Sequence, residues 1–145
     1  MAEDKYQSIT ACAFLYNDDK LFVARRATDK SFMSGIYELP GGHIEWGEDV
    51  KSGLAREMKE EAGIDIIVEE PFYVFDYISK NNTKHTIEVI YFAKLSDSDQ
   101  DITLNPELSE YQWIEQNEVH QYLGDNPEEE KAAIKGFKIL LQDKI

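Results

Sequence analysis

The segment from Gly42 to Ile64 concentrates residues whose types and spacing suit chemistry on phosphates. A glycine turn leads into a predicted helix, and residues three and four apart on a helix are neighbours. Glu57, Glu60 and Glu61 are therefore expected on one edge of that helix, where their carboxylates converge. Hard cations such as Mg²⁺ take oxygen ligands and are commonly shared between carboxylates and substrate phosphates. The spacing predicts a divalent-metal site, with Mg²⁺ expected and Mn²⁺ as its substitute.

The same helix has an apolar stripe that must pack against a core. The stripe lies beside the carboxylates, not opposite them, and consists of Val50, Leu54, Met58 and Ala62. Gly53, one turn before Glu57, removes side-chain bulk on the carboxylate edge, where a ligand would approach. The alternative is a solvated helix face, which glutamates near a lysine often form. We favour the metal site, because clustered carboxylates repel one another unless a cation is present.

The fixed positions of this segment resemble those of the Nudix box. The box reads glycine, five residues, glutamate, seven residues, Arg-Glu, an aliphatic, any residue, Glu-Glu, any residue, glycine and an aliphatic. These positions are filled here by Gly42, Glu48, Arg56-Glu57, Met58, Glu60-Glu61, Gly63 and Ile64. The resemblance implies an α/β fold, in which a mixed β-sheet is sandwiched between α-helices (α/β/α) and the box forms a loop-helix-loop.

The resemblance also implies roles within the box. Glu60 and Glu61 would be the principal metal ligands, with further ligands from Glu57 and the backbone carbonyl of Gly41. Arg56 would orient the neighbouring glutamate. Gly42 and Glu48 would support the box from outside the metal's own ligand set.

Residues outside the box complete the expected site. MutT-like members of the family place an additional glutamate before a tryptophan, and Glu107 precedes Trp113 by six residues. Glu110 competes with Glu107 for this role. Either Glu57 or Glu107 would take the proton of the attacking water, a general-base contribution of about 10²–10⁴-fold in rate.

Two further positions have a ligand-binding and a structural interpretation. The arginines at 25 and 26 resemble a MutT pattern near the nucleotide, and a guanidinium binds phosphate in bidentate fashion. We assign this contact to Arg26, against the alternative of a solvated strand end. Asn126 is assigned to a purine contact by resemblance. Its position before Pro127, with Glu129 third in the helix, equally indicates a helix cap, which we favour.

The reaction implied by the resemblance is Mg²⁺-dependent hydrolysis of a nucleoside diphosphate linked to another group. The marks of other Nudix subgroups are missing, since Ser79 and Asn81 stand where a proline or tyrosine would be expected. By elimination the chain looks MutT-like, converting a nucleoside triphosphate, such as an oxidised purine dNTP, to monophosphate and pyrophosphate. The alternative substrates are ADP-ribose or a nucleotide sugar. A non-catalytic ligand sensor is the alternative of another class, and the complete box argues against it.

Composition sets the outer limits. A length of 145 residues fits one domain spanning 1–145, and the net charge of −14 argues against binding a nucleic-acid polymer or an anionic membrane. The single Cys12, the absence of a signal-peptide pattern and the lack of a long apolar run favour the cytoplasm. Because similar proteins are often dimers, a homodimer is a candidate assembly.

Hydrophobic patterning predicts alternating strands and helices. Strands are expected at 8–16, 21–26, 36–39, 66–68, 72–79, 86–95 and 111–114, with Pro71 interrupting one pair and a turn at 80–83. Helices are expected at about 49–62 and 118–123 and from Pro127 onward, the last with an apolar stripe of Ala133, Phe137, Leu140 and Leu141. This order indicates an α/β layered fold.

Overall fold

A seven-stranded mixed sheet forms the centre of the computed structural model, which describes residues 4–28 and 34–142. Its main path runs β3-β2-β1-β6-β5, with β4 paired to β1 and β7 paired to β2. Only the pairing of β1 with β6 is parallel among those recorded in the described ranges. The strands are β1 (Tyr6–Asn17), β2 (Lys20–Arg26), β3 (Tyr37–Glu38), β4 (Gly41–His43), β5 (Ile66–Ser79), β6 (Lys84–Leu95) and β7 (Leu108–Ile114).

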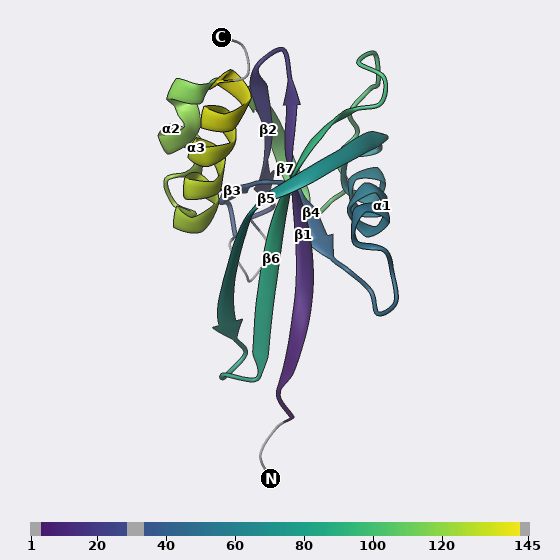
Figure 1. Cartoon of the computed structure of the whole chain (residues 1–145), viewed down its shortest axis with the longest axis vertical. Helices are drawn as coiled ribbons and strands as arrows, with labels where there is room; N and C mark the ends of the chain where they lie inside the picture. The colour runs from purple at the N-terminus through teal and green to yellow at the C-terminus, as the bar shows by residue number, and fades with distance from the viewer. Residues whose placement is uncertain (1–3, 29–33, 143–145) are drawn as a thin grey trace.

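Helices cover both faces of the sheet. Helix α1 (Val50–Ala62) lies on one side, and α2 (Val119–Leu123) and α3 (Pro127–Gln142) lie on the other (Figure 1). Alternate residues of a strand point to opposite faces. In β1, Ala11 and Ala13 accordingly join the core under α1, whereas Cys12 and Phe14 join the core under α3. The expected mixed sheet between helices is confirmed.

The predicted box helix is present and capped at both ends. Asp49, expected as its first residue, is instead the N-cap, and its carboxylate accepts a hydrogen bond from the Ser52 N–H at 3.0 Å. At the C-terminal end Gly63 adopts a left-handed φ of 70° and donates its N–H to the Lys59 carbonyl. These caps satisfy backbone groups that the helix itself leaves unpaired.

Parts of the predicted element map differ clearly from the structure. The turn expected at Pro40, Gly41 and Gly42 runs directly into strand β4 (41–43), which pairs with β1 because two glycines allow the backbones to approach closely. β5 is one continuous strand, since the register shifts around Pro71 absorb the missing N–H without ending the pairing. β7 begins at Leu108, and a 3₁₀ turn (Gln116–Glu118) precedes α2.

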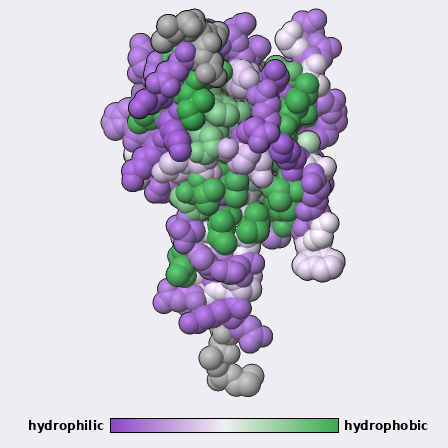
Figure 2. Space-filling model, viewed as in Figure 1, coloured by the Kyte–Doolittle hydropathy of each residue, from purple (hydrophilic) through white to green (hydrophobic). Residues whose placement is uncertain are grey.

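On the face seen in Figure 2, polar side chains surround an apolar area. Figure 2 shows hydrophobic side chains gathered at the centre of the view, within a hydrophilic surround. Val74 and Ile78 of β5 are both 61% exposed. In the described part of the chain, no helix has the length and apolar character needed to cross a bilayer.

Candidate active site

The junction of β4 and α1 brings the first site residues together. A Cβ on Gly41 would lie 2.1 Å from the Ala11 carbonyl oxygen, so the close pairing of β4 with β1 requires glycine there. A Cβ on Gly42 would lie 2.3 Å from Oε2 of Glu57. The space left by Gly42 therefore holds the Glu57 carboxylate, whose side chain is 16% exposed.

Arg56 ties the box residues to one another. Its guanidinium donates to Glu48 at 2.7 and 3.0 Å, to Glu57 at 3.1 Å and to Glu60 at 3.2 Å. It also donates to the His43 carbonyl oxygen at 3.2 Å. Hydrogen bonding from Arg56 lowers the pKa of Glu48 to about 2. Arg56 thus fixes the side-chain positions of the glutamates around it.

Glu48 also explains Gly53. A Cβ on Gly53 would lie 2.8 Å from Oε1 of Glu48 and 2.7 Å from the Ile44 side chain. The expectation that Gly53 leaves room for a ligand is wrong, because the Glu48 carboxylate and Ile44 already fill that space. Gly53 is instead required for the loop before α1 to pack against the helix.

Glu61 is the most buried carboxylate of the box, with 9% of the residue exposed. Burial raises its pKa to about 9, with repulsion from Glu38, Glu57 and Glu107 adding to the effect. Arg26 acts in the opposite direction. The structure therefore places Glu38 of β3, Glu57 and Glu61 of α1, and Glu107 of the loop before β7 in one anionic cluster.

The structure separates the competing candidates outside the box. Arg26 pairs with Glu38 at 3.5 Å, whereas Arg25 is directed to the Gly35 carbonyl and to Glu110. Arg26, not Arg25, is thus the arginine at the cluster, and Glu110 is engaged elsewhere.

Glu107 reaches the cluster through a loop fixed at both sides. The Asn105 N–H donates to the Glu61 carbonyl at 2.8 Å, and the Ala27 N–H donates to the Glu107 carbonyl at 2.9 Å. These bonds join the loop to the end of α1 and to the end of β2. Glu107 is exposed and lies close enough to Glu61 and Glu38 to raise the pKa of both carboxyls.

The three box carboxylates do not converge as fully as the helical spacing predicts. Glu60 is exposed and its carboxylate accepts from Arg56, while Glu61 is turned into the anionic cluster. Within residues 4–28 and 34–142, no three His, Cys, Asp or Glu side chains are arranged as a ready-made metal site. The donor chemistry nevertheless fits a hard cation, because clustered carboxylate oxygens with raised pKa values gain most from a divalent positive charge.

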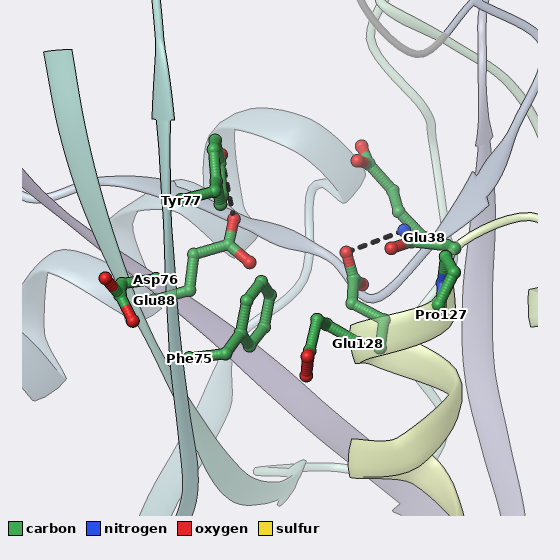
Figure 3. A pocket seen from close by; sticks show the side chains of 9 residues that line it. Glu38, Phe75, Asp76, Tyr77, Glu88, Pro127 and Glu128 are labelled. Atoms are coloured by element: carbon green, nitrogen blue, oxygen red, sulfur yellow. Dashed lines mark hydrogen bonds between the residues drawn. The ribbon is translucent and has the colours of Figure 1, made fainter. Parts of the chain in front are cut away.

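A pocket of about 300 Å³ adjoins the cluster and shares Glu38 with it. Strands β5 and β6 provide one wall, and the N-terminal end of α3 faces them (Figure 3). We call this the acidic pocket; its lining residues are Glu38, Phe75, Asp76, Tyr77, Glu88, Asn126, Pro127, Glu128 and Glu129. Its size lies at the small end of the range for small-molecule sites.

Asn126 lies in this pocket and immediately before α3. Its backbone carbonyl accepts from the Glu130 N–H at 2.9 Å, as expected for a residue that starts a helix. The side chain does something different from the predicted capping box, because Nδ2 donates to Oε2 of Glu129 at 2.8 Å. The other Glu129 oxygen accepts from the Leu39 N–H. Asn126 therefore joins the helix start to a buried carboxylate.

Sequence reasoning missed the three buried carboxyl groups of the pocket, Glu38, Glu88 and Glu129. Burial raises the pKa of Glu38 and of Glu88 to about 7, and raises that of Glu129 well above its ordinary value. One signal was available in the sequence. Glu88 interrupts the otherwise apolar run from Ile87 to Phe92, and a charged residue in a doubly covered strand needs a reason to be there.

Comparison with known proteins agrees with this architecture. The sequence profile of the NUDIX domain matches residues 6–135. The nucleoside triphosphatase NudI of Escherichia fergusonii is 28% identical over 123 residues, covering 80% of this chain and 87% of the relative. The same protein from Escherichia coli is 27% identical over the same length, with the same coverage of both chains.

Solved structures share the fold at lower sequence identity. The MutT protein of Methanosarcina mazei superimposes with a TM-score of 0.72 at 22% identity, covering 94% of this chain and 96% of the other. An ADP-ribose pyrophosphatase from Streptococcus suis gives 0.65 at 19% identity, with 89% and 90% covered. The match over most of the chain, together with the complete box, means that this chain belongs to the NUDIX family and is a hydrolase acting on phosphorus-containing anhydrides.

Proposed function

We propose that the chain hydrolyses nucleoside triphosphates to nucleoside monophosphates and pyrophosphate, with Mg²⁺ as its metal. The observation that carries the proposal is the anionic cluster of Glu38, Glu57, Glu61 and Glu107 beside the acidic pocket. The pocket is large enough to hold a nucleobase. The adjoining cluster, with a bound cation, would hold the phosphate chain. The similarity to a nucleoside triphosphatase supports this substrate class.

Glu57, Glu60 and Glu61, with the Gly41 carbonyl, are the residues we propose to hold the metal. Nudix hydrolases generally use divalent ions. When bound, such an ion neutralises the pyrophosphate and lowers the pKa of its water. Because Glu60 now accepts from Arg56, its carboxylate must turn to join the others.

The remaining roles belong to side chains around these ligands. Arg56 orients Glu57 through its 3.1 Å hydrogen bond, with Glu48 holding the other side of the guanidinium. Arg26 pairs with Glu38 at 3.5 Å beside the cluster, and we assign its guanidinium to a substrate phosphate. A carboxylate, that of Glu57 or Glu107, takes the proton from the water that attacks phosphorus. Asn126 faces the base from the pocket.

The test is hydrolysis of a nucleotide panel in the presence of Mg²⁺, with pyrophosphate distinguished from phosphate. The panel holds canonical and oxidised nucleoside triphosphates, ADP-ribose, nucleotide sugars and dinucleotides. We expect pyrophosphate from triphosphates and its loss in Glu60→Gln. Activity confined to ADP-ribose or nucleotide sugars would contradict the substrate class, and turnover that survives in Glu60→Gln would contradict the metal assignment.

Two carboxylates remain candidates for the base, and paired variants separate them. The residue that acts as base should lose about 10²-fold or more in kcat when changed to glutamine. Glu57→Gln and Glu107→Gln are compared under saturating Mg²⁺, so that weakened metal binding does not mimic loss of the base. Equal, small effects in both variants would exclude both residues as the base.

Light scattering on the same samples measures the molar mass in solution and so tests the proposed homodimer.

A further inference from the structure

The acidic pocket has an unusual balance of hydrogen-bonding groups. Its lining, all within the described residues, includes five carboxylate side chains and contains no lysine, arginine or histidine. A carboxylate offers acceptors only, whereas a neutral carboxyl adds a single donor. The pocket therefore offers more acceptors than donors, and it does not suit a phosphate.

The available donors are few. Tyr77 directs its hydroxyl to Glu88 at 3.5 Å, and Asn126 gives one of its two N–H groups to Glu129. Glu129 is already satisfied at both oxygens, by Asn126 and by the Leu39 N–H. Glu88 has acceptor capacity beyond its one long hydrogen bond. Figure 3 shows Glu88 and Tyr77 on one side of the pocket and Glu38 on the other.

The walls of the pocket suit a flat ring. Phe75 and Tyr77 come from alternate positions of β5 and so lie on the same face of the sheet as Glu88. Aromatic side chains stack with any nucleobase, because every base has a π-face. Stacking here would bind a base without choosing it, which leaves the choice to the polar groups.

The bases differ in what they present to such groups. Adenine, cytosine and guanine each carry an exocyclic amino group with two N–H donors, whereas thymine and uracil have a single ring N–H donor flanked by two carbonyl oxygens. In uracil or thymine the single N–H can pair with one acceptor, but the carbonyl oxygens on both sides of it then face the surplus acceptors without a partner, and this is costly. An amino group facing the same acceptors is satisfied.

We propose that the acidic pocket selects nucleotides whose base carries an exocyclic amino group, and that Glu88 is the specificity residue that accepts from it. This inference rests on the nucleotide-hydrolase function proposed above. Glu88 is suited to this role because it is 8% exposed, comes from strand β6, which lies between β1 and β5, and faces the pocket. The acidic pocket then acts as a filter separate from the metal-binding edge of α1.

Equilibrium binding of nucleoside monophosphates tests the inference without requiring hydrolysis. AMP, CMP, GMP, UMP and TMP are titrated by calorimetry into the full chain with Mg²⁺ present. We expect the three amino-bearing nucleotides to bind at least about tenfold more tightly than UMP and TMP. Equal or tighter binding of UMP or TMP overturns the inference whatever the variants do.

Glu88→Gln identifies the residue responsible. Glutamine keeps the size of the side chain and adds an amide donor that can pair with a carbonyl oxygen, so the preference should fall below about threefold. Glu70→Gln is the matched control. Glu70 lies on β5 outside the pocket and its side chain is 86% exposed, so its substitution should keep the preference. An unchanged preference in Glu88→Gln excludes Glu88 as the specificity residue.

A second variant and a stability measurement guard against misfolding. Glu88→Asp keeps the acceptor and should retain most of the preference, while thermal melting shows whether each variant is folded. Amino-selective binding without hydrolysis of any triphosphate would uphold this inference and reject the proposed function. Hydrolysis of all triphosphates at equal rates, with equal binding of their monophosphates, would do the reverse.

Discussion

Arg56 is the residue whose contacts best define the site at the scale of single side chains. Its guanidinium reaches Glu48 at 2.7 Å, Glu57 at 3.1 Å and Glu60 at 3.2 Å. A lysine carries the charge but not the planar fork that binds several carboxylates at once. We therefore predict that Arg56→Lys lowers kcat by roughly 10- to 100-fold through misplacement of Glu57.

The control for this prediction is a cation on the same helix with a purely surface partner. Lys59 pairs with Asp65 at 3.4 Å, and both side chains are more than half exposed. Lys59→Ala should leave kcat unchanged and stability within about 0.5 kcal/mol. Steady-state kinetics measures both variants. If the kcat of Arg56→Lys equalled that of the wild type, the role of Arg56 in positioning Glu57 would be contradicted.

Asn126 gives the second prediction at this scale. It is 6% exposed and supplies a hydrogen bond to the buried Glu129 carboxyl. Asn126→Ala removes that donor and should lower the free energy of unfolding by about 1–3 kcal/mol. Urea denaturation measures the loss, with the exposed neighbour Asp125→Ala expected to lie within about 0.5 kcal/mol of the wild type. A stable Asn126→Ala with altered base preference would mean that Asn126 serves the ligand alone.

At the scale of elements, the contact between β4 and α1 sets the position of Glu57. A Cβ at Gly42 would enter the space of the Glu57 carboxylate, at 2.3 Å from Oε2. The clashing group is the end of a side chain, so the fold can survive while the carboxylate moves. We predict that Gly42→Ala remains folded by circular dichroism but loses roughly 100-fold in kcat.

Gly47→Ala separates this effect from a general cost of changing glycine. Gly47 has a φ of +80° and nothing within 4 Å of an added Cβ. Its substitution should cost about 1–2 kcal/mol of backbone strain without affecting Glu57. If the two variants lost the same fraction of activity, the steric account of Gly42 would be wrong.

The elements also show how far sequence alone can lead. Helix α1 and the β1–β2 hairpin were predictable, because caps, helical spacing and turn residues are local signals. β4 was not, because its three residues are held by pairing with β1, from a distant part of the chain. The same limit applies to Glu38 and Glu129, whose proximity depends on packing between β3 and α3.

Glu110 illustrates the limit for site residues. Sequence spacing left Glu107 and Glu110 as alternatives, since both precede Trp113 in an acidic stretch. The structure separates the two side chains, because the register of β7 pairs Glu110 with Arg25 of β2. No local sequence pattern indicates the register of β7 against β2.

At the scale of the whole molecule, buried carboxyl groups link stability to pH. The folded-state pKa of Glu88 is raised by burial to about 7, from an ordinary value of 4.5. The unfolded chain releases this proton near pH 4.5 and the folded chain holds it until about pH 7. Stability from this group is thus fully present below the lower value and is lost as pH rises through the higher one.

Glu88→Gln should therefore gain stability relative to the wild type as pH rises. Glutamine does not titrate, so the difference in unfolding free energy should shift by up to about 3 kcal/mol in favour of the variant between pH 4.5 and 7.5. Urea denaturation without divalent metal measures this shift, with Glu70→Gln as the control that should show none. A constant difference across that range would contradict the raised pKa of Glu88.

The carboxylate edge of α1 is the place where we propose that a divalent metal binds, and hydrolysis depends on that metal. The most direct test titrates Mg²⁺ into wild type and Glu61→Gln while recording both triphosphate turnover and thermal stability. We predict that Mg²⁺ raises turnover and melting temperature together in the wild type, as binding to the folded state requires, and that Glu61→Gln loses both responses. Turnover and Mg²⁺-dependent stabilisation that persist in Glu61→Gln would contradict the account.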